Sequence, residues 1–398
     1  MSAMKRVMSE GFRVFFLCAG LYGVITGVIW ALWFLALNGW GINPLEGADH
    51  RLWHAHEMVF GYAGAALGGF FLTAVPNWTN TPSARMGFLS VVAGLWLAGR
   101  LALWFAPALP AGAVAAADLL FIPALALKIA TQLIKRPKPQ NMMFLLILAI
   151  LWTGNLFMHL EWMQLLEDSA GTGVRAGLFA LTAMIVVLGG RITPAFTRNA
   201  MKREGVAESG WPVSATPVER GSLVLSLALP VLVLLPVPAA LPGACALTLG
   251  LVQAVRLARW RGLWALRQPI LFALHLGLGM MGLGLVLWGL AAFGATSELA
   301  ALHIIGIGGV GGMTLAVMSR AALGHSGRPL VAPKAVSAAY ALLALTALVR
   351  WLAEVTAPDS YLILMAGISL MWAGVFLVFV LSFWPALTQP RLSGSGAG

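Results

Sequence analysis

The stretch "RLWHAHEMVFGYAGAALGGFFLTAVPNWT", Arg51 to Thr79, decides the fold class of this chain. From Met58 onward it is almost entirely apolar, and an apolar run of about 20 residues is long enough to cross a bilayer as a helix. The segment therefore predicts a membrane-spanning helix. Its first turns nevertheless carry two imidazoles and a carboxylate, those of His54, His56 and Glu57.

The composition extends this prediction to the whole chain. Of 398 residues, 60% are hydrophobic and only 10% are charged, with a mean hydropathy of +0.88, whereas soluble domains carry about 25% charged residues. Cys18 and Cys245 lie inside apolar runs and form no disulfide framework or c-type haem motif. The net charge of +11 is distributed between the spans, which argues against a nucleic-acid partner.

Twelve apolar segments predict an all-α integral membrane protein, a single polytopic domain over residues 1–398. The run "LPVLVLLPVPAALPGA" is broken by prolines, which disfavour a helix interior and indicate a tight connection between the seventh and eighth spans. The predicted spans are 13–37, 54–76, 86–106, 111–133, 141–164, 174–197, 220–239, 241–258, 268–293, 299–319, 332–354 and 361–385.

The basic residues predict the orientation. With the N-terminus inside, twenty Lys and Arg side chains fall on the inner side and four on the outer side, which places both termini in the cytoplasm. The first span is too long for a cleaved signal peptide. The polar stretch 198–219 is then a cytoplasmic loop between two six-span halves, 1–197 and 220–398. The lipid bilayer is therefore an expected partner of the chain.

Most of the histidines collect at one membrane face in this topology. His54, His56, His159 and His303 lie at the outer ends of spans 2, 5 and 10. A rise of 1.5 Å per residue places the last three within roughly 10 Å of the outer boundary. One reading is a metal or haem site, because imidazole is the commonest metal ligand and paired histidines hold b-type haem. The other is that these side chains face interfacial water.

The spacing of the first pair limits what it can bind. His54 and His56 are about 200° apart on a regular helix, so they cannot hold one metal together. Glu57 could accept a hydrogen bond from an imidazole and so orient it, or it could pair with Arg100. A third interpretation is that its carboxylate is simply exposed to water. Glycines in span 2 and in "HIIGIGGVGGMT" of span 10 indicate close helix packing or a flat macrocycle lying against the helix.

Two motifs lie at the inner face, "GGRITPAFTRN" (189–199) and "MSRAALGHSGRP" (318–329). Their arginines, Arg191, Arg320 and Arg328, suit a propionate, a quinone or another anion, and the alternative is positive-inside anchoring and helix capping. His275, about 12 Å into span 9, is either a ligand or a satisfied buried histidine. Nucleotide-binding, zincin and CxxC motifs are missing from the sequence.

The segments "WHAHEMVFGYAGAALGGFFLTAVPNWT", "GGRITPAFTRNA" and "HIIGIGGVGGMTLAVMSRAALGHSGRPL" resemble, in order, the NnrS family of bacterial membrane proteins. The resemblance implies about twelve spans in the bacterial inner membrane, bound haem and copper, and a role in the response to nitric oxide during denitrification or nitrosative stress. It leaves open whether the chain is an enzyme.

A weaker analogy suggests ligands for these metals. In the main subunits of haem–copper oxidases, histidines of spans 2 and 10 hold the low-spin haem. By this analogy His54 or His56 would bind haem b together with His303. The remaining span-2 histidine, with His159 or Met58, would then be available to copper, because imidazole and thioether ligands suit Cu(I). The dioxygen-reducing motifs of those oxidases are absent.

Three functions follow as hypotheses. The first is a haem- and copper-containing protein that binds or handles nitric oxide near the periplasmic face. The second is a redox enzyme that passes electrons from quinol to nitric oxide. The third is a secondary transporter, because two halves of six spans are a common transporter layout, although the predicted midplane is short of charges.

Overall fold

The computed structural model describes residues 2–41, 43–47, 49–356 and 359–392, and every element within these ranges is a helix. Twelve helical segments are long and apolar enough to cross a membrane. They are Gly11–Leu37 (α2), His50–Thr79 (α3, η1 and α4), Met86–Trp104 (α5), Ala111–Leu133 (α6 and α7), Pro139–Trp162 (α8), Ser169–Arg203 (α9), Thr216–Leu234 (α10), Ala240–Arg259 (α11), Pro269–Ala291 (α13), Glu298–His325 (α14, η4 and α15), Lys334–Thr356 (α16) and Tyr361–Thr388 (α17).

Three of these segments are composite, and four short helices lie outside them. The composite pieces are α3 (His50–His56), η1 (Glu57–Tyr62), α4 (Ala63–Thr79), α6 (Ala111–Leu119), α7 (Phe121–Leu133), α14 (Glu298–His303), η4 (Ile304–Gly311) and α15 (Gly312–His325). The short helices are α1 (Ala3–Val7), η2 (Ala106–Ala108), η3 (Glu208–Gly210) and α12 (Gly262–Ala265).

The predicted all-α fold with twelve candidate spans is therefore confirmed, and each predicted span overlaps one observed helical segment. The proline-rich run contains the predicted connection, because α10 ends at Leu234 and α11 begins at Ala240, although Pro230 lies inside α10 and Pro242 in the first turn of α11. Helix α9 is the largest departure, since Ser169–Arg203 extends beyond the predicted span 174–197 at both ends. The cytoplasmic placement of the termini stays a prediction.

The chain forms two compact units. The first unit comprises residues 1–178, 321–329 and 372–398, and the second comprises residues 179–320 and 330–371. The first unit draws on both ends of the sequence, whereas the second comes from its middle part. The division into halves 1–197 and 220–398 stays a prediction.

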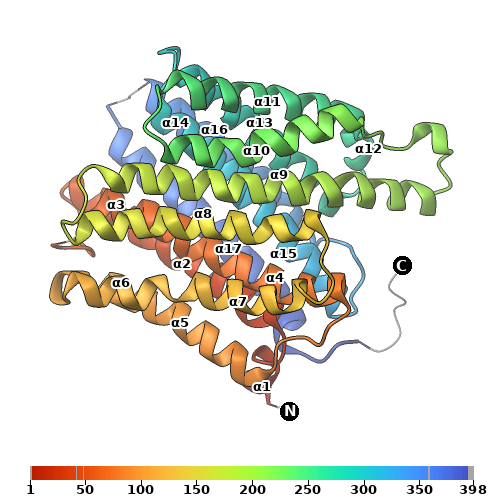
Figure 1. Cartoon of the computed structure of the whole chain (residues 1–398), viewed down its shortest axis with the longest axis horizontal. Coiled ribbons are helices and arrows are strands. Elements are labelled where there is room, and N and C mark those ends of the chain that lie inside the picture. Colours follow the sequence, from red (N-terminus) through yellow and green to blue (C-terminus); the bar gives the residue numbers. More distant parts are fainter. Residues whose placement is uncertain (1, 42, 48, 357–358, 393–398) are drawn as a thin grey trace. The chain divides into compact units, whose positions relative to one another are not determined.

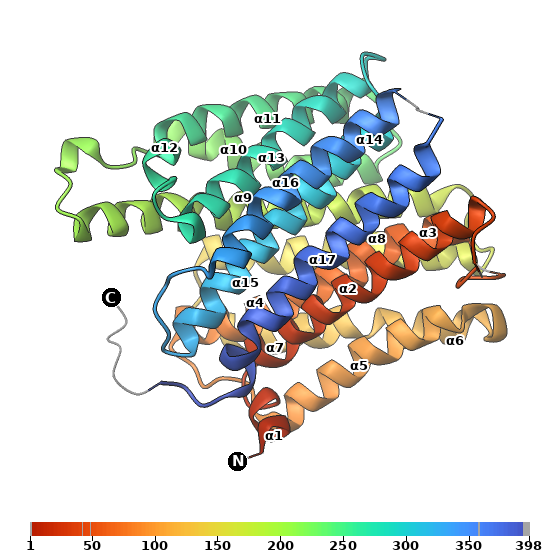
Figure 2. The ribbon, with the colours of Figure 1, turned by 180° about the vertical axis from the view of Figure 1, so that it is seen from behind.

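In the first unit, α2 packs closely against α4 and against the unit's part of α17 (Figure 2). Glycines permit the first contact, because a Cβ atom on Gly69 would lie 2.5 Å from the ring of Phe16. Arg13 secures the second contact. Its Nη1 donates to the carbonyl oxygens of Ala386, Leu387 and Gln389 at 2.9–3.1 Å, and these are groups that the end of a helix leaves unpaired.

In the second unit, α10, α11 and α13 lie side by side (Figure 1). Helices α11 and α13 approach each other through glycines at two levels. A Cβ atom on Gly250 would lie 2.7 Å from the carbonyl oxygen of Gly282, and one on Gly289 would lie 2.7 Å from that of Gly243. Such small-residue contacts let backbones approach within a membrane, where lipid provides no hydrophobic drive for helix association.

Two of the composite spans contain π-helical segments, and each segment begins directly after a histidine. Segment η1 follows His56, and segment η4 follows His303. A π-helix has wider turns with i→i+5 hydrogen bonds, and such segments occur frequently at functional sites. Spans 2 and 10 therefore share a local backbone feature that their periodicity did not predict.

Candidate metal centre

Six polar side chains converge inside the first unit, and all of them are buried. They come from four spans, so tertiary packing rather than local sequence brings them together. They are His56 at the end of α3, Glu57 at the start of η1, Arg100 of α5, Asp118 of α6, and Asn155 and His159 of α8.

Two imidazoles and one carboxylate form the centre of this cluster. Nε2 of His56 lies 3.1 Å from Oδ2 of Asp118, and Nε2 of His159 lies 3.0 Å from the same oxygen. One donor atom of each residue lies within 4.8 Å of the other two. At these separations, one metal ion placed between the three atoms could contact all of them.

Glu57 determines which nitrogen of His56 faces the centre. Oε1 of Glu57 lies 2.8 Å from Nδ1 of His56, so the carboxylate accepts the Nδ1–H hydrogen bond and assigns the Nε2 lone pair to the centre. Metal-binding histidines are commonly oriented by a carboxylate in this way.

Asn155 adds a further oxygen to the same position. Its Oδ1 lies 2.7 Å from Nε2 of His56, while its Nδ2 donates to Oδ2 of Asp118 at 2.7 Å. If His56 is neutral and protonated at Nδ1, its Nε2 lone pair faces two oxygen acceptors. Either a proton on Nε2 or a metal cation among these atoms would remove this conflict.

The charges also favour a cation. Arg100 bridges the two carboxylates, donating from Nη1 to Glu57 at 2.5 Å and from Nη2 to Asp118. One arginine against two carboxylates leaves the cluster with a net charge of −1 when the imidazoles are neutral. A buried net charge is costly unless it is paired, and a bound metal ion would provide the missing positive charge.

Two glycines make room for the cluster. A Cβ atom on Gly61 would lie 2.6 Å from Nη1 of Arg100, and one on Gly99 would lie 2.7 Å from Oδ1 of Asp118. Gly61 therefore lets the arginine cross η1 to reach Glu57, and Gly99 lets α6 approach α5. These glycines shape the site although they contribute no ligand atom.

Aromatic rings enclose the imidazoles. The ring of His56 lies 5.0 Å from that of Phe60 and 5.4 Å from that of Trp162, which also contacts His159 at 5.1 Å. His56 has no exposed surface. The site therefore fits a single metal ion, whereas a haem macrocycle could reach His56 only by displacing Asp118 or Asn155.

The other span-2 candidates lie apart from this centre. The ring of His54 stacks on Trp30 at 4.1 Å with an interplanar angle of 7°. His54 and His56 thus have different neighbours, as their predicted 200° separation requires. Met58 is half-buried on η1, and Arg328, in the first unit, donates to Oε1 of Gln389 at 3.1 Å.

The remaining predicted residues belong to the second unit. Nδ1 of His303 is 2.8 Å from the carbonyl oxygen of Leu299, and Nε2 of His275 is 3.0 Å from Oγ1 of Thr197. The guanidinium group of Arg320 lies over the ring of Phe196 at 4.1 Å. Arg191 lies half-buried on α9.

The structure thus brings together four of the predicted residues, His56, His159, Glu57 and Arg100, and adds Asp118 and Asn155, which the sequence analysis missed. Asp118 carried a signal, because it is the only carboxylate in span 111–133, and ionisable residues within spans are functional candidates by default. Asn155 carried none, since a single amide in an apolar helix does not indicate its partner.

Comparison with known protein families agrees with the resemblance seen in the sequence. The family model described as "NnrS protein" matches residues 6–391. This range includes all twelve candidate spans and all six residues of the buried cluster. No curated protein sequence matches the chain.

Proposed function

Because this chain belongs to the NnrS family of nitric-oxide-response membrane proteins, we propose that His56, Asp118 and His159 hold a metal ion at which nitric oxide binds. The observation that supports this proposal most strongly is the arrangement around Nε2 of His56. In the neutral imidazole with Nδ1–H bonded to Glu57, the Nε2 lone pair shares one buried position with Oδ2 of Asp118 and Oδ1 of Asn155, which is a site for a cation.

The donor set limits the metal. Two imidazoles with one carboxylate suit copper, zinc or iron, and the same combination is typical of non-haem Fe(II) centres with open positions. Copper is our choice because the family resemblance implies it. The bound ion would supply an open coordination position for a small neutral ligand, while Phe60 and Trp162 exclude water from the two imidazoles.

Haem b would occupy a different place. Nδ1 of His303 lies 2.8 Å from the carbonyl oxygen of Leu299, and metal-bound histidines commonly donate the N–H of one ring nitrogen to a backbone carbonyl in this way. In that arrangement Nε2 would be the ligating nitrogen. A Cβ atom on Gly306, three residues further along the same span, would meet no atom within 4 Å. This open helix surface next to His303 would accommodate the edge of a macrocycle. His54 is the span-2 candidate for haem, because His56 is enclosed.

The expected setting is the inner membrane of a bacterium, with the metal centre near the periplasmic face. The excess of arginine and lysine on the side of the N-terminus supports this orientation. Nitric oxide is uncharged and dissolves in hydrocarbon, so a buried centre within the span bundle suits its approach.

Metal analysis of the purified full-length protein tests the proposal. We expect a bound transition metal in the wild type and its loss in His56→Ala, His159→Ala and Asp118→Ala. His325→Ala is the matched control, because this histidine lies in the first unit against Phe12 and outside the cluster. Nitric oxide should change the metal's optical or electron paramagnetic resonance spectrum only in the wild type and the control.

Haem is tested separately by the Soret band. His303→Ala should abolish this band, whereas His56→Ala should keep it while losing the other metal. A metal content that is equal in the wild type and in all three cluster variants would overturn the proposed centre.

A further inference from the structure

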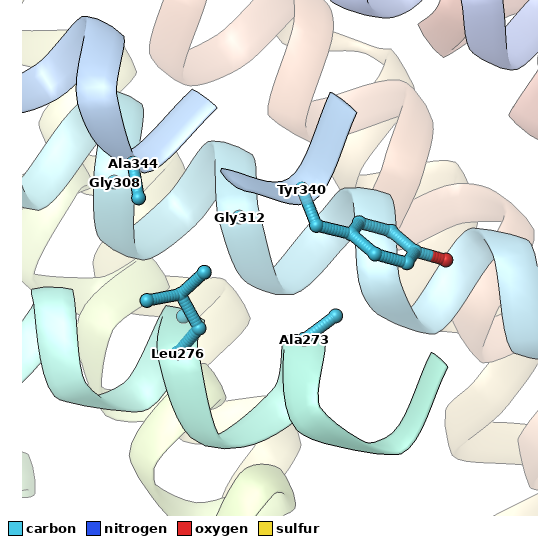
Figure 3. Close-up of a pocket in the computed structure, with 7 residues that line it drawn as sticks. Ala273, Leu276, Gly308, Gly312, Tyr340 and Ala344 are labelled. Carbon is cyan, nitrogen blue, oxygen red and sulfur yellow. The ribbon is translucent and has the colours of Figure 1, made fainter. Parts of the chain in front are cut away.

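The second unit contains a small pocket between three helices (Figure 3). Helix α13 lines one side, the junction of η4 and α15 lines the second, and α16 lines the third. The residues that line it are Ala273, Leu276, Gly277, Gly308, Gly312, Tyr340 and Ala344.

The backbone of span 10 explains why this space remains open. Gly308 and Gly312 bring the span close to α13, because a Cβ atom on Gly308 would lie 2.8 Å from Met280 and one on Gly312 would lie 3.3 Å from Gly277. Toward α16 the lining side chains are those of Tyr340 and Ala344, and Ala344 contributes only a methyl group. Protein interiors contain few voids, so an opening at this widened helical segment is a specific feature of the packing.

The size and lining of the pocket indicate its ligand. It has space for about one water-sized molecule. Its lining is mostly apolar, from methyl, methylene and ring carbons and from glycine backbone, and the hydroxyl of Tyr340 points away from Leu276 and Ala344 (Figure 3). A buried water needs two to four polar partners, and apolar cavities remain dry and take up apolar ligands such as xenon. The lining therefore favours a small apolar molecule, close to water in size, over water itself.

We propose that this pocket, hereafter the gas pocket, binds an uncharged diatomic gas. The identification of that gas as nitric oxide rests on the proposed function. Gly308 lies five residues after His303 on the same span, so a molecule in the gas pocket would occupy the segment that also carries the haem candidate. The role would be to hold nitric oxide inside the membrane-embedded protein before it reaches a metal.

Crystals of the full-length protein pressurised with xenon test this proposal, because anomalous density reports the position of each xenon atom. We expect xenon between α13, η4 and α16 in the wild type and its loss in Ala344→Leu, which fills the gas pocket. Leu276→Ala should enlarge the gas pocket and so raise the xenon occupancy. Gly367→Ala in the same unit is the matched control, because its added methyl group meets no atom within 4 Å and should leave the occupancy unchanged.

A stopped-flow measurement of nitric oxide binding to the metal-loaded protein completes the test. Ala344→Leu should slow association while leaving the metal and haem contents unchanged. Gly367→Ala should change neither the association rate nor these contents. Absence of xenon from the wild type would overturn the gas pocket. Unchanged association in Ala344→Leu would overturn the assignment of nitric oxide to it. Since xenon binding needs no metal, failure of the proposed centre at His56 would be seen separately in the metal analysis.

Discussion

His56 and Asp118 lie 62 residues apart in the sequence, yet Nε2 of the first and Oδ2 of the second are 3.1 Å apart and fully enclosed. The contact joins span 2 to span 4, and Arg100 of span 3 ties the same aspartate to Glu57. Three successive spans thus depend on one polar cluster. Its members have different roles, since some would hold or orient the metal and Arg100 balances the charge. Single substitutions should therefore affect metal affinity and stability to different extents.

Glu57→Gln should weaken metal binding more than it weakens the fold. The amide can still accept the hydrogen bond from Nδ1 of His56, but it lacks the charge that strengthens the basicity of the opposite nitrogen. Loss of such an orienting partner reduces metal affinity by about 10–100-fold. Competitive titration with a chelator would measure the change, with exposed Glu46→Gln as the control. Equal affinities in both variants would contradict the orienting role.

Arg100→Gln should destabilise the metal-free protein strongly. It removes the only cation of the cluster and leaves Glu57 and Asp118 as buried carboxylates without a counter-charge. Breaking a buried ion pair from one side costs about 3–5 kcal/mol. Unfolding in detergent would measure this loss, and exposed Arg136→Gln should show almost none. The double variant Glu57→Gln/Arg100→Gln should lose less than the sum of the two single variants.

Gly190→Ala should destabilise the second unit, because the added methyl group would overlap the guanidinium group of Arg256. That arginine is buried and donates to Gln253 and Glu219, each at 2.7 Å. Overpacking of this kind costs about 1–3 kcal/mol. Gly94→Ala in α5 makes the same chemical change where no atom lies within 4 Å. The melting temperature should fall only in the first variant, and a similar fall in both would refute the explanation.

The predicted topology can be tested by labelling single cysteines in spheroplasts with a membrane-impermeant maleimide. Glu46→Cys should react from outside and Glu208→Cys should not, because the positive-inside distribution places residues 198–219 in the cytoplasm. Both positions are exposed in the structure, so burial would not protect either of them. Reaction of Glu208→Cys alone would invert the orientation.

The spans were predictable from the sequence because lipid imposes a length and a composition on each helix separately. The break after Leu234 was predictable for a similar reason, since clustered prolines act locally. Even the opposite directions of His54 and His56 follow from helix geometry alone. All these features depend on residues close together in the chain.

The composition of the buried cluster was not predictable in the same way. The histidines of spans 2 and 5 were candidates, but nothing local shows that His159 and Asn155 meet His56 rather than another span. Asp118 was detectable as a lone carboxylate in an apolar helix, although its partners were not. Glycine is needed at positions 61 and 99 because Arg100 and Asp118 occupy the space that a side chain there would take. Only the folded structure shows these two contacts.

In spans 2 and 10, the direction of the histidine before each π-helical segment depends on the number of residues between it and the end of the span. A π segment contains one residue more than the α-helical backbone would need over the same path. Because of this extra residue, deleting one residue within 58–62 would convert η1 to an α-helix over the same path and leave the direction of the preceding His56 unchanged. Deleting one residue from α4 instead would turn His56 by about 100° relative to the remainder of the span. The same distinction applies to His303, with η4 and α15. A single-residue deletion in the α-helical part of either span, which changes no ligand, would therefore move the histidine away from its partners, whereas the same deletion in the π segment would keep its direction.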